Sequence, residues 1–188
     1  MNRALLIIDI QNDYFPGGAM ELVASPAAGV KAGELLRAFR EHARPVVHIQ
    51  HVSTRAGATF FLPNTTGVEI HQSVRPDHGE TVIQKNFPNS FRDTPLLDYL
   101  RGQKITQLVI AGMMTQMCVD STTRAAADFG FQCLLARDAC ATKSLTFAGV
   151  SVSAENVQAA FLAALNGLFA KVLAVEEICA DLKAGESG

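Results

Sequence analysis

Residues 107–126, QLVIAGMMTQMCVDSTTRAA, place a cysteine where an apolar run gives way to a segment of good helix formers. The apolar residues 107–111 predict a strand that is buried on both faces. Residues 116–129, which are followed by Gly130, predict a helix. Cys118 therefore falls in the predicted first turn of a helix, at the carboxyl end of a strand.

The same alternation of strand and helix recurs along the whole chain. Apolar runs predict six strands, over residues 4–10, 45–52, 81–84, 107–111, 131–136 and 171–175. The segments between them predict helices over residues 28–43, 93–102, 116–129 and 154–169. Strands that alternate with helices form crossover units, so we expect an α/β fold with a parallel sheet and helices on both faces.

Two further segments do not follow this pattern. Residues 53–78 carry glycines, prolines and polar residues around Phe60 and Phe61, and they predict a long excursion of the kind that is often functional. Residues 183–188, KAGESG, predict a frayed tail. No linker or repeat divides the chain, so we expect a single domain over residues 1–188.

Composition restricts the class of protein and its partners. Of the 188 residues, 48% are hydrophobic and 18% charged, which is typical of a globular protein, and the net charge of −2 argues against a nucleic-acid partner. Asp9 interrupts the first apolar run too early for a secretory signal, and no stretch is long enough to span a bilayer. We expect a cytoplasmic protein with no membrane partner. The four cysteines lack zinc-ligand spacing, and we expect free thiols.

Three reactive residues come at the predicted carboxyl ends of strands, where sites gather in open α/β sheets. Asp9 follows the first strand, Lys85 the third, and Cys118 the fourth. Each has an ordinary structural interpretation alone, but their convergence on one edge favours a site. A helix start and a lysine would favour the thiolate, a carboxylate could accept the thiol proton, and the N–H groups of residues 112–118 could bind an oxyanion.

These motifs resemble those of the isochorismatase-like cysteine hydrolases. The matching stretches are ALLIIDIQNDYF around Asp9, VIQKNFPNSFRDTPLLDYL around Lys85 and LVIAGMMTQMCVDSTTRAA around Cys118, with PVVHIQHVS and LLARDACAT between and after them. The resemblance implies a three-layer α/β/α fold whose six-stranded parallel sheet has the order 3-2-1-4-5-6. It also implies a catalytic triad of Asp9, Lys85 and Cys118, a cis peptide bond between Met113 and Met114, and an oxyanion hole formed by the N–H groups of Met114 and Cys118.

The activity implied is hydrolysis of a C–N bond in a small amide or carbamoyl-type substrate, through a thioester on Cys118 and without a cofactor. Residues near the motif edge are the expected substrate contacts: Gln11, Phe15, His51, Phe60, Phe91, Met113 and Met117. By analogy with the family we expect a homo-oligomer, a dimer or larger.

Three other interpretations remain open. Nicotinamidases of this family bind a metal through an Asp-x-His motif, but HIQHVSTRAG (residues 48–57) contains no aspartate, so we expect no metal. A catalytically silent α/β binding protein would keep the fold without using the triad. A redox protein would pair Cys118 with Cys133 or Cys140. A nucleotide-binding fold is disfavoured because DIQNDYFPGGA after the first strand lacks a phosphate-binding glycine pattern.

Overall fold

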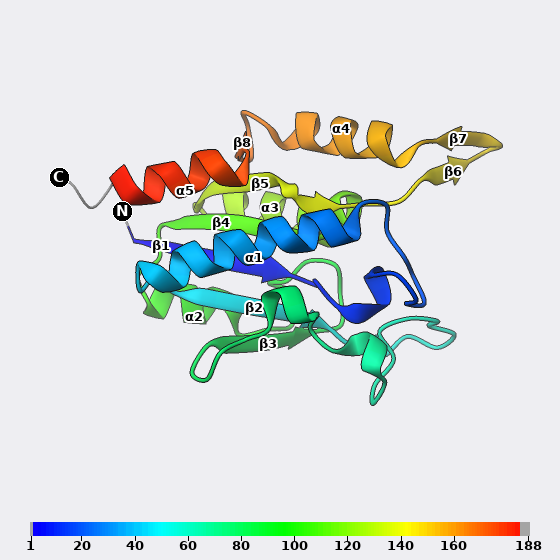
Figure 1. Cartoon of the computed structure of the whole chain (residues 1–188), viewed down its shortest axis with the longest axis horizontal. Helices are drawn as coiled ribbons and strands as arrows, with labels where there is room; N and C mark the ends of the chain where they lie inside the picture. The colour runs from blue at the N-terminus through cyan, green and yellow to red at the C-terminus, as the bar shows by residue number, and fades with distance from the viewer. Residues whose placement is uncertain (1, 185–188) are drawn as a thin grey trace.

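A six-stranded parallel sheet forms the centre of the molecule in the computed structural model, which describes residues 2–184 (Figure 1). Across the sheet the strands are β3 (Thr81–Lys85), β2 (Val46–His51), β1 (Arg3–Ile8), β4 (Gln107–Met113), β5 (Gln132–Ala141) and β8 (Lys171–Leu173). Counted within the sheet alone, this is the order 3-2-1-4-5-6. The predicted strand order is confirmed.

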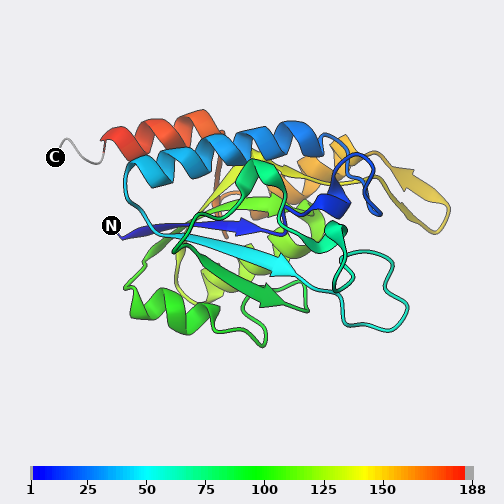
Figure 2. The same ribbon diagram turned by 60° about the horizontal axis from the view of Figure 1, so that its bottom comes forward.

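Helices cover both faces of the sheet and complete three layers (Figures 1 and 2). On one face, α1 (Ser25–Glu41) and α5 (Val175–Ala184) bury Leu35 and Ile178 in a single apolar cluster with β1. On the other face, α2 (Leu96–Gly102), α3 (Asp120–Asp128) and α4 (Ala154–Leu165) contribute to a second cluster. None of these helices is both long enough and apolar enough to cross a membrane, among the residues described.

Several predicted boundaries and elements are corrected by the structure. The helix expected over 116–129 is divided into a π-helical turn, Thr115–Val119, followed by α3. The helix expected over 154–169 ends at Leu165, because Asn166 has an extended backbone with a ψ of 130° and Gly167 follows with a φ of 95°. The last strand is shorter than predicted, and α5 occupies residues 175–184, where no helix was expected. Of the predicted frayed tail, Lys183 and Ala184 are helical, and residues 185–188 lie outside the described residues.

A second sheet was not predicted. It is a two-stranded antiparallel hairpin of β6 (Leu145–Phe147) and β7 (Val150–Val152), which projects from the body beside α4 (Figure 1). The two loop residues, Ala148 and Gly149, have φ values of 50° and 80°. Two central residues with positive φ define the turn whose twist matches a tight hairpin.

The predicted excursion over residues 53–78 contains two short 3-10 turns, Thr66–Val68 and Gln72–Val74. The buried carboxylate of Asp13 anchors it, since its Oδ2 accepts the N–H of Phe61 at 2.6 Å and its Oδ1 accepts the N–H of Ala19 at 3.1 Å. Sequence reasoning had given Asp13 no role.

The register of the sheet brings three strand ends together. His51 at the end of β2 pairs with Lys85 at the end of β3, and the N–H of Asp9, just past β1, donates to the Ile49 carbonyl at 3.0 Å. On the other side of β1, Ile8 pairs with Gly112 of β4. A Cβ at Gly112 would collide with the Ile8 carbonyl, so glycine permits β4 to deliver the following turn close to Asp9.

Candidate active site

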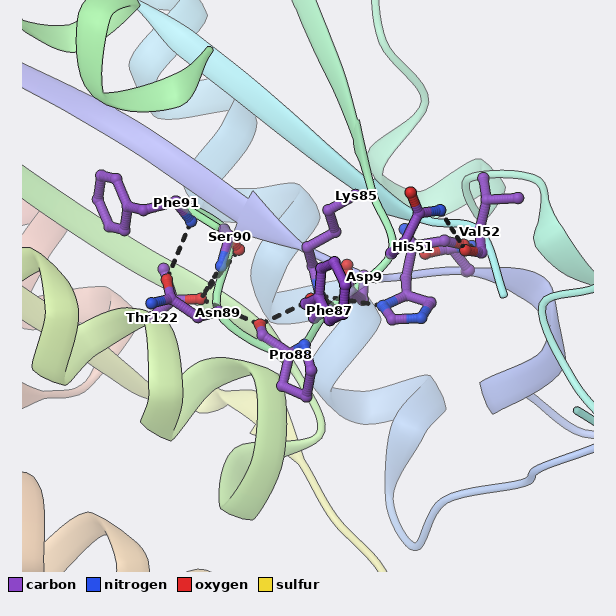
Figure 3. A network of polar contacts seen from close by, with 12 residues as sticks. Asp9, His51, Val52, Lys85, Phe87, Pro88, Asn89, Ser90, Phe91 and Thr122 are labelled. Atoms are coloured by element: carbon purple, nitrogen blue, oxygen red, sulfur yellow. Dashed lines mark hydrogen bonds and ion pairs between the residues drawn. The ribbon is translucent and has the colours of Figure 1, made fainter. Parts of the chain in front are cut away.

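Asp9 and Lys85 form an ion pair inside the protein. Asp9 Oδ2 lies 2.7 Å from Lys85 Nζ, and neither side chain is exposed. The ammonium group also donates to the carbonyls of Phe87 and Pro88 at 3.0 and 3.2 Å, and it lies 3.2 Å from His51 Nδ1 (Figure 3). With Asp9, the ammonium has four acceptors around its three hydrogens. Asp9 therefore interacts with the Lys85 ammonium and with the Cys118 thiol, and its carboxylate is placed to accept the thiol proton.

Cys118 faces this pair from the π-helical turn, and 5% of it is exposed. One carboxylate oxygen of Asp9, one ring nitrogen of His51 and the Sγ of Cys118 all lie within 4.8 Å of one another. The structure therefore brings Asp9, Lys85 and Cys118 together, with His51 as a fourth member of the cluster.

Burial and the charge of Asp9 keep the Cys118 thiol protonated at rest. Burial raises the pKa of Cys118 well above its usual value, the charge of Asp9 raises it further, and Lys85 opposes both effects. Lys85 favours the thiolate, as predicted, but burial and the charge of Asp9 outweigh it in the resting protein. For Lys85 itself, burial would lower the pKa, but the negative charges of Asp9 and Cys118 raise it overall.

Burial lowers the pKa of His51, so its imidazole is neutral near pH 7. Lys85 can only donate to Nδ1, and this contact assigns the remaining proton to Nε2. A neutral imidazole therefore stands beside the thiol and carboxylate with one N–H group to offer.

The turn that carries Cys118 begins with a cis peptide bond between Met113 and Met114. The carbonyl of Met114 accepts the N–H of Met117 at 3.0 Å and that of Val119 at 3.3 Å. These two donors flank Cys118. Helix-start N–H groups have no helical carbonyl to reach, and the N–H groups of Met114 and Cys118 stand at this start.

A side-chain network fixes the turn to its neighbours. Thr115 Oγ1 lies 2.7 Å from Gln158 Oε1 of α4 and 3.2 Å from the Ala141 carbonyl of β5. Gln158 Nε2 in turn donates to the Cys140 carbonyl at 3.2 Å. Sequence reasoning missed both Thr115 and Gln158, and no local pattern connects these two distant positions.

Three predicted substrate contacts have structural roles instead. Gln11 Nε2 donates to the carbonyls of His51 and Val68 at 2.9 and 2.7 Å, and its Oε1 accepts the N–H of His51 at 2.7 Å, so both N–H donors of its amide are engaged within the protein. Phe15 is buried and stacks on His71 with ring centroids 3.5 Å apart.

Phe91 is the third. It packs against Phe129 and Phe131, at centroid distances of 5.2 and 6.3 Å. Its ring points away from the Asp9–Lys85 pair (Figure 3). Phe91 therefore belongs to the core.

The other predicted contacts lie on or near the turn that carries Cys118, or in the excursion over residues 53–78. Met113 is fully buried at the end of β4, while Met117 is 43% exposed on the π-helical turn. Phe60 is half-buried, with its ring 6.0 Å from that of Tyr14. Tyr14 was missed, although it lies in the first motif. Burial raises its pKa well above the usual value, and the charges of Cys118 and Asp9 add to this.

The site contains side chains that could bind a metal ion, but the positively charged Lys85 lies among them. Asp9, His51 and Cys118 have ligand atoms at metal-binding spacing. The Lys85 ammonium lies among these same atoms and opposes a second positive charge. The other histidine of β2, His48, is fully buried and its Nε2 lies 2.9 Å from Glu80, so it is engaged in a separate ion network.

Comparison with known proteins agrees with this fold. The isochorismatase domain family model matches residues 3–177. The isochorismatase family protein YddQ of Bacillus subtilis, itself uncharacterised, is 49% identical over 176 residues, covering 94% of this chain and 98% of YddQ. A solved structure from Oleispira antarctica, assigned to the isochorismatase hydrolases, has a TM-score of 0.92 at 47% identity and covers 95% of this chain and 96% of its own. The nicotinamidase/pyrazinamidase of Mycobacterium tuberculosis is more distant, 25% identical over 179 residues, which cover 84% of this chain and 91% of that protein.

Proposed function

The chain belongs to the isochorismatase family, and on this premise we propose that it is a cysteine-dependent hydrolase of small amide or carbamoyl-type compounds. The observation that carries the proposal is the position of Asp9. Its buried carboxylate is paired with Lys85 and lies beside the Cys118 thiol. This is the arrangement that a nucleophile and its general base require.

The first half of the reaction forms a thioester. Asp9 takes the proton from Cys118 Sγ, and the sulfur attacks the carbonyl carbon of the substrate. The N–H groups of Met114 and Cys118 stabilise the resulting oxyanion. Asp9 then returns the proton to the leaving nitrogen as the C–N bond breaks. The charge of Lys85 offsets the negative charge that appears on sulfur during this exchange.

The second half releases the acid. Water attacks the thioester while Asp9 accepts its proton, and Asp9 passes this proton to the sulfur as the C–S bond breaks, which restores the thiol. No step needs an oxidant or a metal ion, which separates this scheme from the nicotinamidase-type alternative. The ion network of His48 with Glu80, and the Lys85 charge among the three donors, support the metal-independent form. We retain His51, Phe60, Met113 and Met117 as proposed substrate contacts.

A panel of primary amides, ureido acids and N-carbamoyl compounds, assayed by ammonia or amine release, tests the proposal. The purified chain should hydrolyse at least one of them, and Cys118→Ala should abolish this turnover. Cys133→Ala is the matched control, because the two thiols are 5% and 6% exposed, and it should keep the activity. Full turnover by Cys118→Ala would contradict the mechanism, and a chain inert on the whole panel would favour a silent binding protein.

A further inference from the structure

Two backbone carbonyls hold the Lys85 ammonium, and both belong to the loop that follows β3. Lys85 Nζ donates to the carbonyls of Phe87 and Pro88 at 3.0 and 3.2 Å. The start of this loop is fastened to the segment after β2, because Asn86 Nδ2 donates to the Val52 carbonyl at 2.7 Å. The Lys85 side chain is fully shielded from solvent, so its charge depends on acceptors within the protein. The position of the ammonium therefore depends on the position of this loop.

The other end of the loop is fastened to α3 by the hydroxyl of Thr122 (Figure 3). Thr122 Oγ1 accepts the N–H of Ser90 at 3.0 Å and donates to the Pro88 carbonyl at 3.4 Å. Because Thr122 has one hydroxyl hydrogen, Ser90 Oγ is the donor in the 2.9 Å contact between the two hydroxyls. Neither residue is exposed. The Pro88 carbonyl thus receives both the Thr122 hydroxyl and the Lys85 ammonium.

Thr122 lies on the same continuous stretch of helix as Cys118. The π-helical turn Thr115–Val119 runs directly into α3, and Thr122 follows Cys118 by about one helical turn. A loop that is fastened to this helix keeps its position relative to the thiol. The contacts from Lys85 through Pro88 to Thr122 therefore connect the buried cation to the element that carries the sulfur.

We propose that Thr122 is a positioning residue for Lys85, because its hydroxyl holds the loop after β3 against α3 and so sets the distance between the Lys85 ammonium and Cys118 Sγ. This inference rests on the proposed function, in which the charge of Lys85 offsets the charge that appears on sulfur. The alternative role for Thr122 and Ser90 is packing alone. Their hydroxyls would then satisfy buried polar groups without any effect on the thiol.

Thr122→Val keeps the branched shape of the side chain but removes its hydroxyl. The buried N–H of Ser90 then loses its acceptor, and the Pro88 carbonyl loses one of its two donors, so the loop is no longer held in place. In the wild-type chain Lys85 lowers the pKa of Cys118, against the larger effects of burial and Asp9. An ammonium that retreats from the sulfur lowers this pKa less, and a smaller fraction of the thiol is then ionised at a given pH.

Iodoacetamide labelling of Cys118, read by mass spectrometry at several pH values, tests the proposal without a substrate. The thiolate is the form that reacts, so the labelling rate reports the ionised fraction. In Thr122→Val the labelling of Cys118 should slow about 3- to 10-fold at each pH, which moves the rate profile to higher pH by about 0.5–1 pH unit. Thr122→Ser keeps the hydroxyl and should restore the wild-type profile.

Thr123→Val is the matched control. Thr123 is the next residue of α3 and is as fully buried as Thr122, but its hydroxyl has no hydrogen-bond partner among residues 2–184. Its replacement should leave the labelling profile of Cys118 unchanged. Ser90→Ala provides a second variant if Thr122→Val does not fold, and it should move the profile in the same direction by a smaller amount.

The direction of the change separates positioning from packing. Loosened packing would speed the labelling of Cys118 together with that of Cys133 and Cys140, which are buried as well. The proposal predicts slower labelling of Cys118 alone. A wild-type profile in the Thr122 and Ser90 variants, or faster labelling of all three cysteines, would overturn it. A wild-type chain that shows this shift but hydrolyses none of the amides would refute the proposed activity and leave the positioning role standing.

Discussion

Asp9 Oδ2 lies 2.7 Å from Lys85 Nζ, and both side chains are fully shielded from solvent. A buried ion pair contributes little net stability, because desolvation offsets most of the attraction, but removing one partner leaves an uncompensated charge. The pair is therefore better explained by chemistry than by stability. It places a carboxylate that is held by a single cation next to the protonated Cys118 thiol.

Replacing Asp9 should make the Cys118 thiol more acidic and should also lower the turnover. The charge of Asp9 raises the pKa of Cys118, so Asp9→Asn should shift the iodoacetamide labelling of Cys118 to lower pH. The same variant should lose about 100- to 10,000-fold in turnover, because the general base is gone. Labelling against pH, read by mass spectrometry, is the measurement. Asp128→Asn, at an exposed site, should change neither quantity. An unchanged labelling profile in Asp9→Asn would show that the two side chains do not interact.

Removing the cation should destabilise the fold. Lys85→Met leaves Asp9 as an unpaired buried charge, so the free energy of unfolding in urea should fall by about 3–5 kcal/mol. The double variant Asp9→Asn, Lys85→Met should recover part of this loss, since no buried charge remains. If Lys85→Met is as stable as wild type, the pair is not buried as the structure has it.

Gln158 should act as a positioning residue for the catalytic turn. Gln158→Ala removes the acceptor of Thr115 Oγ1 at 2.7 Å, and the turn can then shift relative to Asp9. We expect the acylation rate of Cys118 by p-nitrophenyl acetate to fall roughly 10- to 100-fold. Asn156→Ala, exposed on the same helix, is the control. A merely structural role would lower the melting temperature and leave the acylation rate of the folded protein unchanged.

Glu80 should make stability depend on pH in acid. Burial would raise its pKa, but hydrogen bonds from Arg40, the N–H of Asp77 and His48 lower it to about 2, from a usual value of 4.5. Its contribution is complete above the unfolded value and is lost as the pH falls from 4.5 towards 2. Glu80→Gln should flatten the dependence of the unfolding free energy over this interval, compared with the exposed control Glu69→Gln. Parallel curves for Glu80→Gln and wild type would contradict the assignment.

Much of this fold could be predicted from periodicity and motif order. Continuous apolar runs identified all six strands of the main sheet, and the site residues follow from where those strands end. The hairpin was missed even though TF and VSV flank a two-residue Ala148-Gly149 loop, because alanine is an unusual first residue for such a turn. The helix α5 was missed because Lys171–Val175 was interpreted as one strand, which hid the helical spacing of Val175, Ile178 and Leu182.

The sequence indicated which residues form the site better than it indicated how those residues behave chemically. The direction in which the Cys118 pKa shifts depends on how deeply the thiol is buried, and the depth of burial cannot be read from the sequence. Gln11 and Phe91 lie in the recognised motifs, yet hydrogen bonding and ring packing assign them to structure. Thr115 and Gln158 interact across two elements that only the tertiary fold brings together.

The central claim is that Cys118 is a nucleophile activated by Asp9, and acid-quenched intact-protein mass spectrometry with p-nitrophenyl acetate tests it most directly. The account predicts one acetyl group per chain, located by peptide mapping at Cys118, absent from Cys118→Ala and formed much more slowly in Asp9→Asn. Acetylation at another residue, or an equal rate in Asp9→Asn, would contradict it.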